Sequence, residues 1–207
     1  MSEEVVDRVA RWDERYTDRE YLWDVGPNQF VERLLVGLTP GTAVDLAAGE
    51  GRNAVWLARQ GWSVTAVDFS QVGLDKAQRL AADHGVGERV RLVRADALTW
   101  APDEPVDLVV IAYLQLPPDE VRTALEHATG WLRPGGRVLV VAHDRANVEH
   151  GHGGPPTEDV CYDLDSTVEA LAGLEVELAE VAERQVETED GPRTALDTLV
   201  IARRQVG

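Results

Sequence analysis

The stretch Val44-Asp45-Leu46-Ala47-Ala48-Gly49-Glu50-Gly51-Arg52-Asn53 decides the fold. Its apolar first half is typical of a short buried strand, and Gly49-Glu50-Gly51 predicts a turn that no bulky side chain could follow closely. A helix is expected over residues 53–59, with Gly61 just beyond its end. This order predicts a nucleotide-type pocket, because glycines let a ligand approach the backbone and a helix start offers unpaired N–H groups.

The charges beside this turn discriminate between two ligand classes. The residues from Gly49 to Ala54 fit the dinucleotide pattern G-x-G-x-x-G/A. A pyrophosphate there would meet Glu50, with Asp45 nearby at the strand end, and like charges repel strongly in a partly dry pocket. A ligand carrying a sulfonium, an ammonium and a ribose would be attracted instead. The sequence therefore favours S-adenosylmethionine as cofactor, and an NAD(P)-binding oxidoreductase is the alternative.

The bulk composition is that of one globular domain, expected over residues 1–207. The chain is 44% hydrophobic and 28% charged, and Cys161 is its one cysteine. Its formal charge is −17, with 37 acidic and 20 basic residues and no basic run, which disfavours nucleic acid as a partner. No apolar run is long enough to cross a bilayer, and the acidic start does not resemble a signal peptide. We expect a cytoplasmic protein.

Two further predicted strands are each followed by an acid. Residues 63–67 lead to Asp68, roughly 20 residues after the glycine turn, where a carboxylate accepts ribose hydroxyls; the alternative is that Asp68 only caps the next element. Residues 90–94 lead to Asp96, which either accepts from an adenine amine or forms a turn. The backbone N–H of Ala97 could then meet an adenine ring nitrogen. The predicted cofactor site also includes the neighbouring residues Phe69 and Leu98.

The N-terminal region, residues 1–40, combines a predicted helix with a cluster of aromatic residues. Residues 3–16 have helical periodicity, and Trp12, Tyr16 and Trp23 precede the first strand. These rings either pack on the sheet or form a lid in which aromatic faces attract a sulfonium. Pro27 is expected to be the first residue of a second helix.

The second half of the chain continues the pattern and then changes it. A buried strand over residues 106–112 precedes Tyr113, a helix follows Pro117, and residues 131–136 read as a turn before a strand over 137–142. Residues 143–162 form a long Gly- and Pro-rich segment, interpreted as an acceptor loop, and a short helix near 166–171 follows. The last two strands, 174–185 and 194–203, are joined by a hairpin turn at 189–192.

Five βα units and a final hairpin predict an α/β fold with a parallel sheet and one reversed strand. Ligands of such sheets bind beyond the carboxyl ends of the strands. Five candidate residues fall at such ends: Asp45, Asp68, Asp96, Tyr113 and His143.

These motifs resemble those of class I S-adenosylmethionine-dependent methyltransferases, from about Trp12 to the C-terminus. The glycine motif from Asp45 to Gly51 is similar to theirs, Asp68 matches the ribose-binding acid, and Asp96-Ala97 matches the adenine-side motif. The resemblance implies a doubly wound, Rossmann-like, seven-stranded sheet of order 3-2-1-4-5-7-6 with an antiparallel last strand. The Gly-Arg-Asn sequence after the turn and the upstream Trp and Tyr resemble a narrower branch, the thiopurine-, halide/thiol- and tellurite-resistance-type enzymes.

Departures from related groups narrow the expected chemistry. The His-Arg pair of tellurite-type members is replaced by Glu183-Arg184, which disfavours chalcogen oxyanions. The Asp/Asn-Pro-Pro-Tyr/Phe motif of enzymes that methylate bases or glutamine is absent after the fourth strand. Ala112-Tyr113 supplies no acid of the kind that holds Mg²⁺ in catechol-type enzymes, so we expect no metal. The expected acceptor is a small molecule with a thiol, a phenol or hydroxyquinoline-like group, or an amine.

The predicted catalytic residue is His143, as a base that Asp144 would orient, although a histidine at a strand end is often structural. A metal-binding role for Glu149, His150 and His152 is disfavoured by the intervening Gly and Pro residues. The set predicted to contact substrate is Trp23, Leu114, Leu116, His143, Asn147, His152 and Arg193. The set predicted to contact cofactor is Asp45, Ala47, Gly49, Glu50, Gly51, Asn53, Asp68, Phe69, Asp96, Ala97, Leu98, Tyr113, Trp12 and Tyr16. A non-catalytic cofactor-binding domain is a further alternative, and either a monomer or a homodimer is compatible with the sequence.

Overall fold

The structure is a computed structural model that describes residues 3–22 and 25–206, with side chains from Val5 onward. The strands form a seven-stranded sheet of order β3-β2-β1-β4-β5-β7-β6, which confirms the predicted order. The chain divides into two compact units, Met1–Trp100 and Ala101–Gly207, and each is described by itself. The expectation of a single domain stays a prediction.

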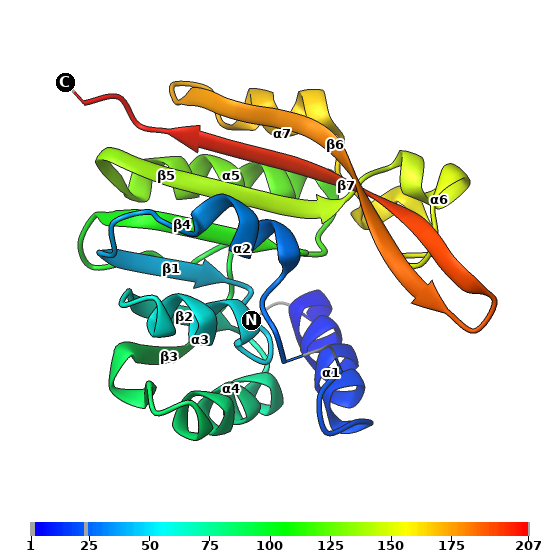
Figure 1. Cartoon of the computed structure of the whole chain (residues 1–207), viewed down its shortest axis with the longest axis horizontal. Helices are drawn as coiled ribbons and strands as arrows, with labels where there is room; N and C mark the ends of the chain where they lie inside the picture. Colours follow the sequence, from blue (N-terminus) through cyan, green and yellow to red (C-terminus); the bar gives the residue numbers. More distant parts are fainter. Residues whose placement is uncertain (1–2, 23–24, 207) are drawn as a thin grey trace. The chain divides into compact units, whose positions relative to one another are not determined.

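The first unit has three parallel strands and the helices around them (Figure 1). In chain order its elements are α1 (Glu3–Thr17), α2 (Gln29–Leu35), β1 (Thr42–Leu46), α3 (Arg52–Arg59), β2 (Ser63–Asp68), α4 (Gln71–Asp83), the 3₁₀ turn η1 (Gly87–Arg89) and β3 (Val90–Arg94). Strand β2 lies between β1 and β3, so its end at Asp68 is flanked by strands on both sides.

The starts of α2 and α4 in this unit are set by side-chain caps. The Ser70 hydroxyl accepts from the Gly73 N–H at the start of α4, as predicted. The expectation that Pro27 begins the second helix is wrong. Helix α2 begins at Gln29, because Asn28 is its N-cap. The Asn28 side chain accepts from the N–H groups of Phe30 and Val31, whereas a proline side chain has no acceptor atom for them.

The second unit contains β4 and β5, which are parallel, and β7, which is antiparallel to both β5 and β6. In chain order its elements are β4 (Val106–Ala112), α5 (Pro118–Trp131), β5 (Leu132–His143), α6 (Ala146–His150), the 3₁₀ turn η2 (Glu158–Val160), α7 (Leu164–Ala170), β6 (Glu175–Thr188) and β7 (Gly191–Arg203). The turn predicted at 131–136 is not found, since Trp131 ends α5 and residues 132–136 belong to β5, whereas α6 and η2 lie within the predicted loop 143–162.

The β6–β7 hairpin is longer than β5. Its loop is two residues, since Thr188 pairs with Gly191, whereas the pairing of β5 with β7 ends at His143 opposite Asp197. The hairpin, orange to red in Figure 1, therefore continues past the end of β5. In the described parts of the chain, no helix is long and apolar enough to cross a membrane.

Candidate active site

The turn after β1 is built from backbone conformations that favour glycine. Gly49 and Gly51 have φ angles of 54° and 78°. A Cβ at Gly49 would lie 2.6 Å from the Tyr16 hydroxyl, and a Cβ at Gly51 would lie 2.6 Å from the Ala77 Cβ. Ala47 also has a positive φ, of 60°, a strained value for alanine. Both glycines are therefore required by close approach as well as by backbone angle.

Asp68 lies at the end of β2 and holds this turn. The Gly49 N–H donates to its Oδ2 and the Ser70 N–H to its Oδ1, both at 2.8 Å. Burial, opposed by the Ser70 and Gly49 hydrogen bonds, raises the pKa of Asp68 to about 6. A carboxylate offers about four acceptor positions, so Asp68 retains acceptor capacity beyond its bonds to the backbone. The ribose contact stays a prediction.

Asp45 is almost fully enclosed, with 1% of its surface exposed. The Ala54 N–H donates to its Oδ2 at 3.0 Å, and burial raises its pKa to about 7. Its oxygen thus holds the first turn of α3. Asn53 has a comparable role, since its Oδ1 accepts from the Asn28 N–H at 2.9 Å. Direct cofactor contact by either residue stays a prediction.

The surroundings of Glu50 differ from the expectation that its charge faces the ligand. Its carboxylate lies 2.8 Å from the ammonium of Lys76, and the two side chains are 4% and 6% exposed. The Leu22 N–H donates to both carboxylate oxygens, at 3.0 and 2.9 Å. The negative charge expected to face the ligand is therefore compensated inside the protein, and Asp68 is the better candidate for an acid at the turn that meets a ligand.

Tyr16 packs against the glycine turn and is buried. The Trp12 ring centre lies 5.5 Å from that of Tyr16, with the two ring planes tilted by 32°. The predicted contact of both rings with the cofactor stays a prediction. Burial and then the neighbouring Asp68 charge raise the pKa of the Tyr16 hydroxyl well above its usual value. This hydroxyl stays protonated at neutral pH and can act as a hydrogen-bond donor.

The residues after β3 form a turn. The Leu98 N–H donates to Asp96 Oδ1 at 2.9 Å, which is the turn-forming alternative for this acid, and Ala97 is buried. Phe69 follows Asp68, and its carbonyl accepts from Arg94 Nε. Adenine recognition by Asp96, Ala97 and Leu98 stays a prediction.

A second cluster lies in the second unit around Asp197, whose surface is fully buried. Arg184 Nε donates to its Oδ2 at 2.6 Å, and the Tyr113 hydroxyl donates to the same oxygen at 3.0 Å. His143 Nδ1 lies 3.3 Å from the other oxygen, Oδ1. Although burial acts to raise the pKa of Asp197, His143 and Arg184 outweigh it and lower that pKa below its ordinary value.

His143 has the surroundings of an oriented base. Its side chain is 10% exposed, and Nδ1 and Asp197 Oδ1 face each other without meeting hydrogen-bond geometry. Among the described residues, no hydrogen bond is made to Nε2, which leaves that nitrogen for a ligand. The expectation that Asp144 orients His143 is wrong. The oxygens of Asp144 accept from the Ala146 N–H and the Thr198 hydroxyl, because Asp144 turns the chain after β5.

Tyr113 is held in a strained conformation beside His143. Its φ is 59°, its N–H donates to the Val141 carbonyl at 2.7 Å, and its ring centre lies 4.6 Å from that of His143. Positive φ is rare for an aromatic residue and tends to mark functional positions. Tyr113 thus lies in the His143 cluster; its predicted cofactor contact stays a prediction.

The other residues predicted to contact substrate have diverse positions. Leu114 and Leu116 are buried, and the Tyr162 hydroxyl donates to the Leu114 carbonyl at 3.0 Å. Asn147 is buried and fixes the chain nearby: its Oδ1 accepts from the Leu196 N–H and its Nδ2 donates to the Gly153 carbonyl. Trp23 lies outside the described residues.

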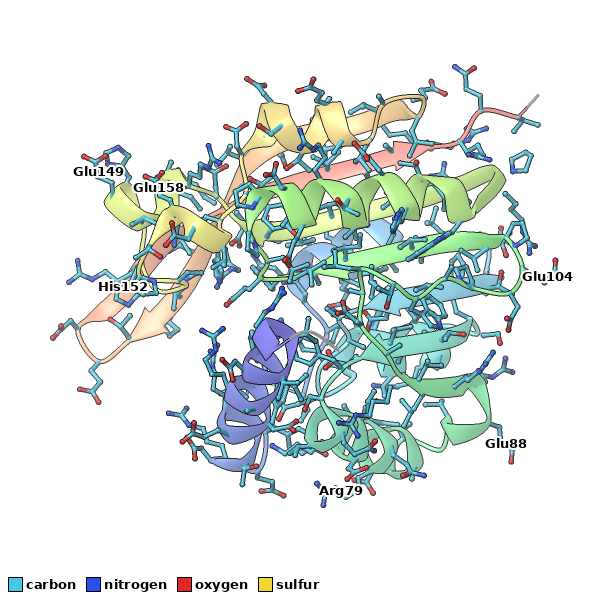
Figure 2. The ribbon with its side chains drawn as sticks, turned by 180° about the vertical axis from the view of Figure 1, so that it is seen from behind. Arg79, Glu88, Glu104, Glu149, His152 and Glu158 are labelled. Atoms are coloured by element: carbon cyan, nitrogen blue, oxygen red, sulfur yellow. The ribbon has the colours of Figure 1, made fainter. Side chains whose placement is uncertain are left out.

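Two of the residues in that set lie on the surface. His152 is exposed, and Figure 2 shows it at the edge of the unit with Glu149 and Glu158. Arg193 is exposed and four residues from Asp197 along β7, so it lies roughly 13 Å further along the strand. In the described part of the chain, no group of three or more His, Cys, Asp or Glu side chains could hold a metal ion.

Sequence reasoning missed Lys76, Arg184 and Asp197. Asp197 had a detectable signal, because it is an acid inside the otherwise apolar run of β7, where a buried charge needs a partner. Arg184 and Lys76 had none, since cations on a strand and on an amphipathic helix usually face solvent.

Comparison with known proteins identifies the domain. Residues 43–136 match the family model of a methyltransferase domain. A thiopurine S-methyltransferase from Vibrio cholerae is 34% identical over 122 residues, covering 52% of this chain and 55% of that protein. The chain spans 30–56% of the length of seven other curated relatives that it matches.

Two solved structures share the fold. One, from a study of the conversion of a disulfide bond into a thioacetal group during echinomycin biosynthesis, has a TM-score of 0.75 at 23% identity, covering 99% of this chain and 92% of that chain. The other is the N-methyltransferase NodS from Bradyrhizobium japonicum with S-adenosyl-L-homocysteine, with a TM-score of 0.69 at 16% identity, covering 95% and 97%. Residues 43–136 thus match a methyltransferase domain, and the strand order and glycine motif support a class I S-adenosylmethionine-dependent methyltransferase.

Proposed function

We propose that the protein transfers a methyl group from S-adenosylmethionine to a small-molecule acceptor, with His143 as the base that receives the acceptor's proton. The observation that carries this proposal is the pairing of His143 with the fully buried Asp197 at the end of β5. A carboxylate beside Nδ1 favours the tautomer that has its proton on Nδ1, so Nε2 is left with the lone pair.

The first unit has the features that the cofactor needs. Glycines at 49 and 51 allow the positive φ angles of the turn after β1, and Asp68 at the end of β2 has acceptor capacity for ribose hydroxyls. When bound, S-adenosylmethionine supplies a methyl group on a positively charged sulfur. The protein's contribution to such a transfer is mainly alignment and exclusion of water.

The second unit contains a group that can accept a proton from the acceptor. A thiol, phenol or protonated amine must lose a proton to present its lone pair, and Nε2 of His143 can take it. The positive charge that forms on the ring would be stabilised by Asp197, with Arg184 and Tyr113 keeping that carboxylate in place. The thiopurine relative acts on sulfur, as its name states, which supports testing thiols first.

The test has two stages. Calorimetry of the wild-type protein with S-adenosylhomocysteine should show binding, whereas binding of NADH alone would overturn the proposal in favour of an oxidoreductase. Thiol, phenol, hydroxyquinoline and amine acceptors are then assayed with wild type, His143→Gln and the control His127→Gln, an exposed histidine on α5. General-base catalysis contributes about 10²–10⁴-fold, so His143→Gln should lose activity by that factor and His127→Gln should not. Cofactor binding without turnover of any acceptor would favour the non-catalytic alternative.

A further inference from the structure

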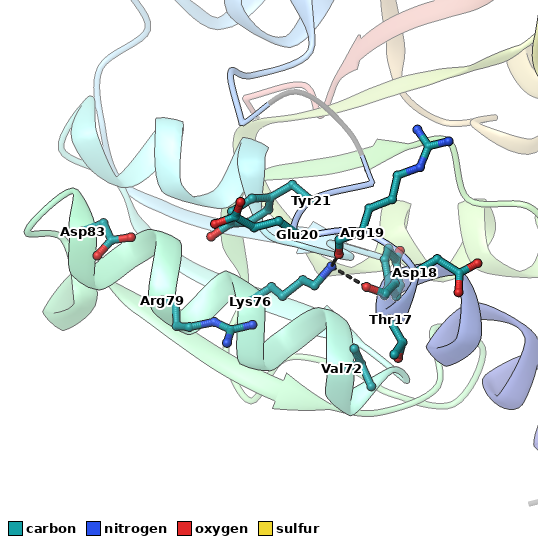
Figure 3. Close-up of a pocket in the computed structure, with 10 residues that line it drawn as sticks. Thr17, Asp18, Arg19, Glu20, Tyr21, Val72, Lys76, Arg79 and Asp83 are labelled. Carbon is teal, nitrogen blue, oxygen red and sulfur yellow. Dashed lines mark hydrogen bonds between the residues drawn. The ribbon is translucent and has the colours of Figure 1, made fainter.

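Lys76 on α4 has an unusual environment for a lysine, because 5% of its surface is exposed. Its ammonium donates to the carbonyls of Tyr16 and Arg19, the latter at 2.7 Å, and to Glu50 Oε1 at 2.8 Å. An ammonium has three donors, and all three are used. Figure 3 shows Lys76 reaching from α4 to the backbone of the segment that follows α1.

The segment held by Lys76, residues 16–22, also bonds to the glycine turn. Glu50 accepts from the Leu22 N–H with both oxygens. The Lys76–Glu50 pair is therefore hydrogen-bonded to three backbone groups of the segment: the Tyr16 carbonyl, the Arg19 carbonyl and the Leu22 N–H. At the start of the segment, the Tyr16 side chain contacts the turn. Its hydroxyl is 2.6 Å from the position of a Cβ on Gly49, and its ring is 3.3 Å from that of a Cβ on Gly73. The backbone of Tyr16 is thus fixed on one side and its ring rests on the turn on the other.

We propose that Lys76 is a positioning residue, which together with Glu50 holds residues 16–22 so that Tyr16 is seated against the cofactor turn at Gly49. This inference rests on the proposed function, in that the turn binds the cofactor. Lys76 contacts no ligand itself. Its effect on cofactor affinity passes through the Tyr16 carbonyl.

A direct electrostatic role of Glu50 makes the opposite prediction. If Glu50 attracted the cationic cofactor itself, removing the Lys76 charge would leave the carboxylate uncompensated and would tighten binding of S-adenosylmethionine. If Lys76 positions Tyr16, its removal weakens binding. The sign of the change in Kd therefore separates the two roles.

The first experiment compares Lys76→Met with Arg79→Met. Both side chains line the same pocket of about 600 Å³ beside the segment, but Arg79 is exposed and bonds to neither Tyr16 nor Arg19 in the described structure. Calorimetry with S-adenosylmethionine and S-adenosylhomocysteine should show about tenfold weaker binding in Lys76→Met and no change in Arg79→Met. Trypsin should cut after Arg19 faster in Lys76→Met alone. Unchanged or tighter binding would overturn the proposal.

The double variant Lys76→Met/Glu50→Gln separates positioning from stability, because Lys76→Met alone leaves a buried carboxylate without its cation. The double variant has no buried charge at this place. It should regain much of the melting temperature while binding stays weak and cleavage after Arg19 stays fast. Recovery of wild-type affinity and protection would mean that Lys76 only balances charge, and the proposal would fall.

The two proposals fail in different ways. If the wild type binds neither form of the cofactor, the proposed function fails, and so does the cofactor part of this inference. Cleavage after Arg19 needs no ligand, so it still reports whether Lys76 holds residues 16–22. If the wild type binds and Lys76→Met binds equally well, the proposed function stands and the positioning role is excluded.

Discussion

The two units each contain a buried carboxylate beside a cation, and they use it differently. In the first unit, Glu50 has Lys76 and the Leu22 N–H as partners, and each ammonium donor of Lys76 has an acceptor. In the second unit, Arg184 and Tyr113 share one oxygen of Asp197, while the other oxygen and His143 Nδ1 are buried without a hydrogen bond. One network is complete and the other has two unsatisfied atoms that face each other.

The difference indicates two roles: the complete network around Lys76 holds backbone in place, and the incomplete network around Asp197 contains the group expected to react. A buried polar atom without a partner costs about 1–3 kcal/mol, so proteins tolerate few of them. A hydrogen bond forms at His143 if the ring shifts into hydrogen-bond geometry with Asp197, and a ring that has received a proton would attract Asp197 more strongly. The complete network around Lys76 gains nothing from such a change. We therefore expect substitutions at Asp197 to affect turnover and substitutions at Glu50 to affect binding and stability.

The largest expected effect is that of Asp197→Asn. The amide keeps the shape of the carboxylate but can neither stabilise a charged His143 ring nor balance Arg184. Methyl transfer should slow by about 10³-fold, within the 10²–10⁴ range of general-base catalysis, and the Kd of S-adenosylhomocysteine should hardly change. Single-turnover assays and calorimetry measure the two quantities. Equal changes in the methyl-transfer rate and in the Kd of S-adenosylhomocysteine would contradict the distinction between the two networks.

Glu50→Gln is the matched control in the first unit. It also turns a buried carboxylate into an amide and leaves Lys76 without its counter-charge. The rate at saturating cofactor should stay within a few-fold of wild type, because the bonds of Glu50 to Lys76 and to the Leu22 N–H hold backbone of the first unit and involve no proton-accepting group. A loss of rate as large as that of Asp197→Asn would show that the network of Glu50 and Lys76 does more than hold the backbone in place.

Sequence patterns were sufficient for the elements that carry strong local signals. The bounds of β3 and β4 agree with the expected residues 90–94 and 106–112, and Ser70 caps α4 as its position before an amphipathic run indicates. The buried strands could be placed because runs of Val, Ile, Leu and Ala are distinctive. The glycine turn could be placed because the chain must adopt positive φ there.

The partners of the site residues could not be found in the same way. His143 meets Asp197 only through the register of β5 against β7, which joins residues 54 positions apart. Neighbouring Asp144 was the natural expectation from local sequence, yet successive residues of a strand point to opposite faces. Glu50 and Lys76 are likewise brought together by the packing of α4 beside the turn, and an ion pair of this kind leaves no local pattern.

The next largest effect is expected at Asp68, whose Asn variant should weaken binding of S-adenosylhomocysteine by about 100-fold. Asn keeps one acceptor for the Gly49 N–H but loses the charge that strengthens hydrogen bonds from ribose hydroxyls, and a hydrogen bond to a charged group is worth about 1.5–3 kcal/mol. Calorimetry measures the loss. Asp45→Asn is a useful reference, because Asp45 is buried under α3 and should change affinity much less.

The pH dependence of cofactor binding should be smaller and should follow from the same carboxylate. The pKa of Asp68 is raised to about 6 by burial, so the ionised form that accepts ribose hydroxyls strongly is depleted below that pH. Affinity for S-adenosylhomocysteine should be constant above pH 7 and should fall by about tenfold between pH 7 and pH 5. Because Asp45 has its pKa at about 7, the Asp68→Asn variant serves as control and should show a flatter profile. An affinity that rises on acidification would contradict the assignment.

The smallest effect is a steric one at Gly154, which covers the His143 ring. A Cβ there would lie 3.0 Å from Nδ1 and 3.1 Å from Cε1 of His143, while a Cβ on Gly153 would meet nothing within 4 Å. Both residues have positive φ, 81° and 72°, so alanine at either costs about 1–2 kcal/mol of backbone strain, and the pair isolates the contact with the ring. We expect both variants to lose similar stability in thermal unfolding, but only Gly154→Ala to lower turnover, by about three- to tenfold, because a small displacement of a catalytic group is enough to slow a reaction. Equal turnover in the two variants would show that His143 has freedom to move, and that its distance from Asp197 does not need to be fixed for catalysis.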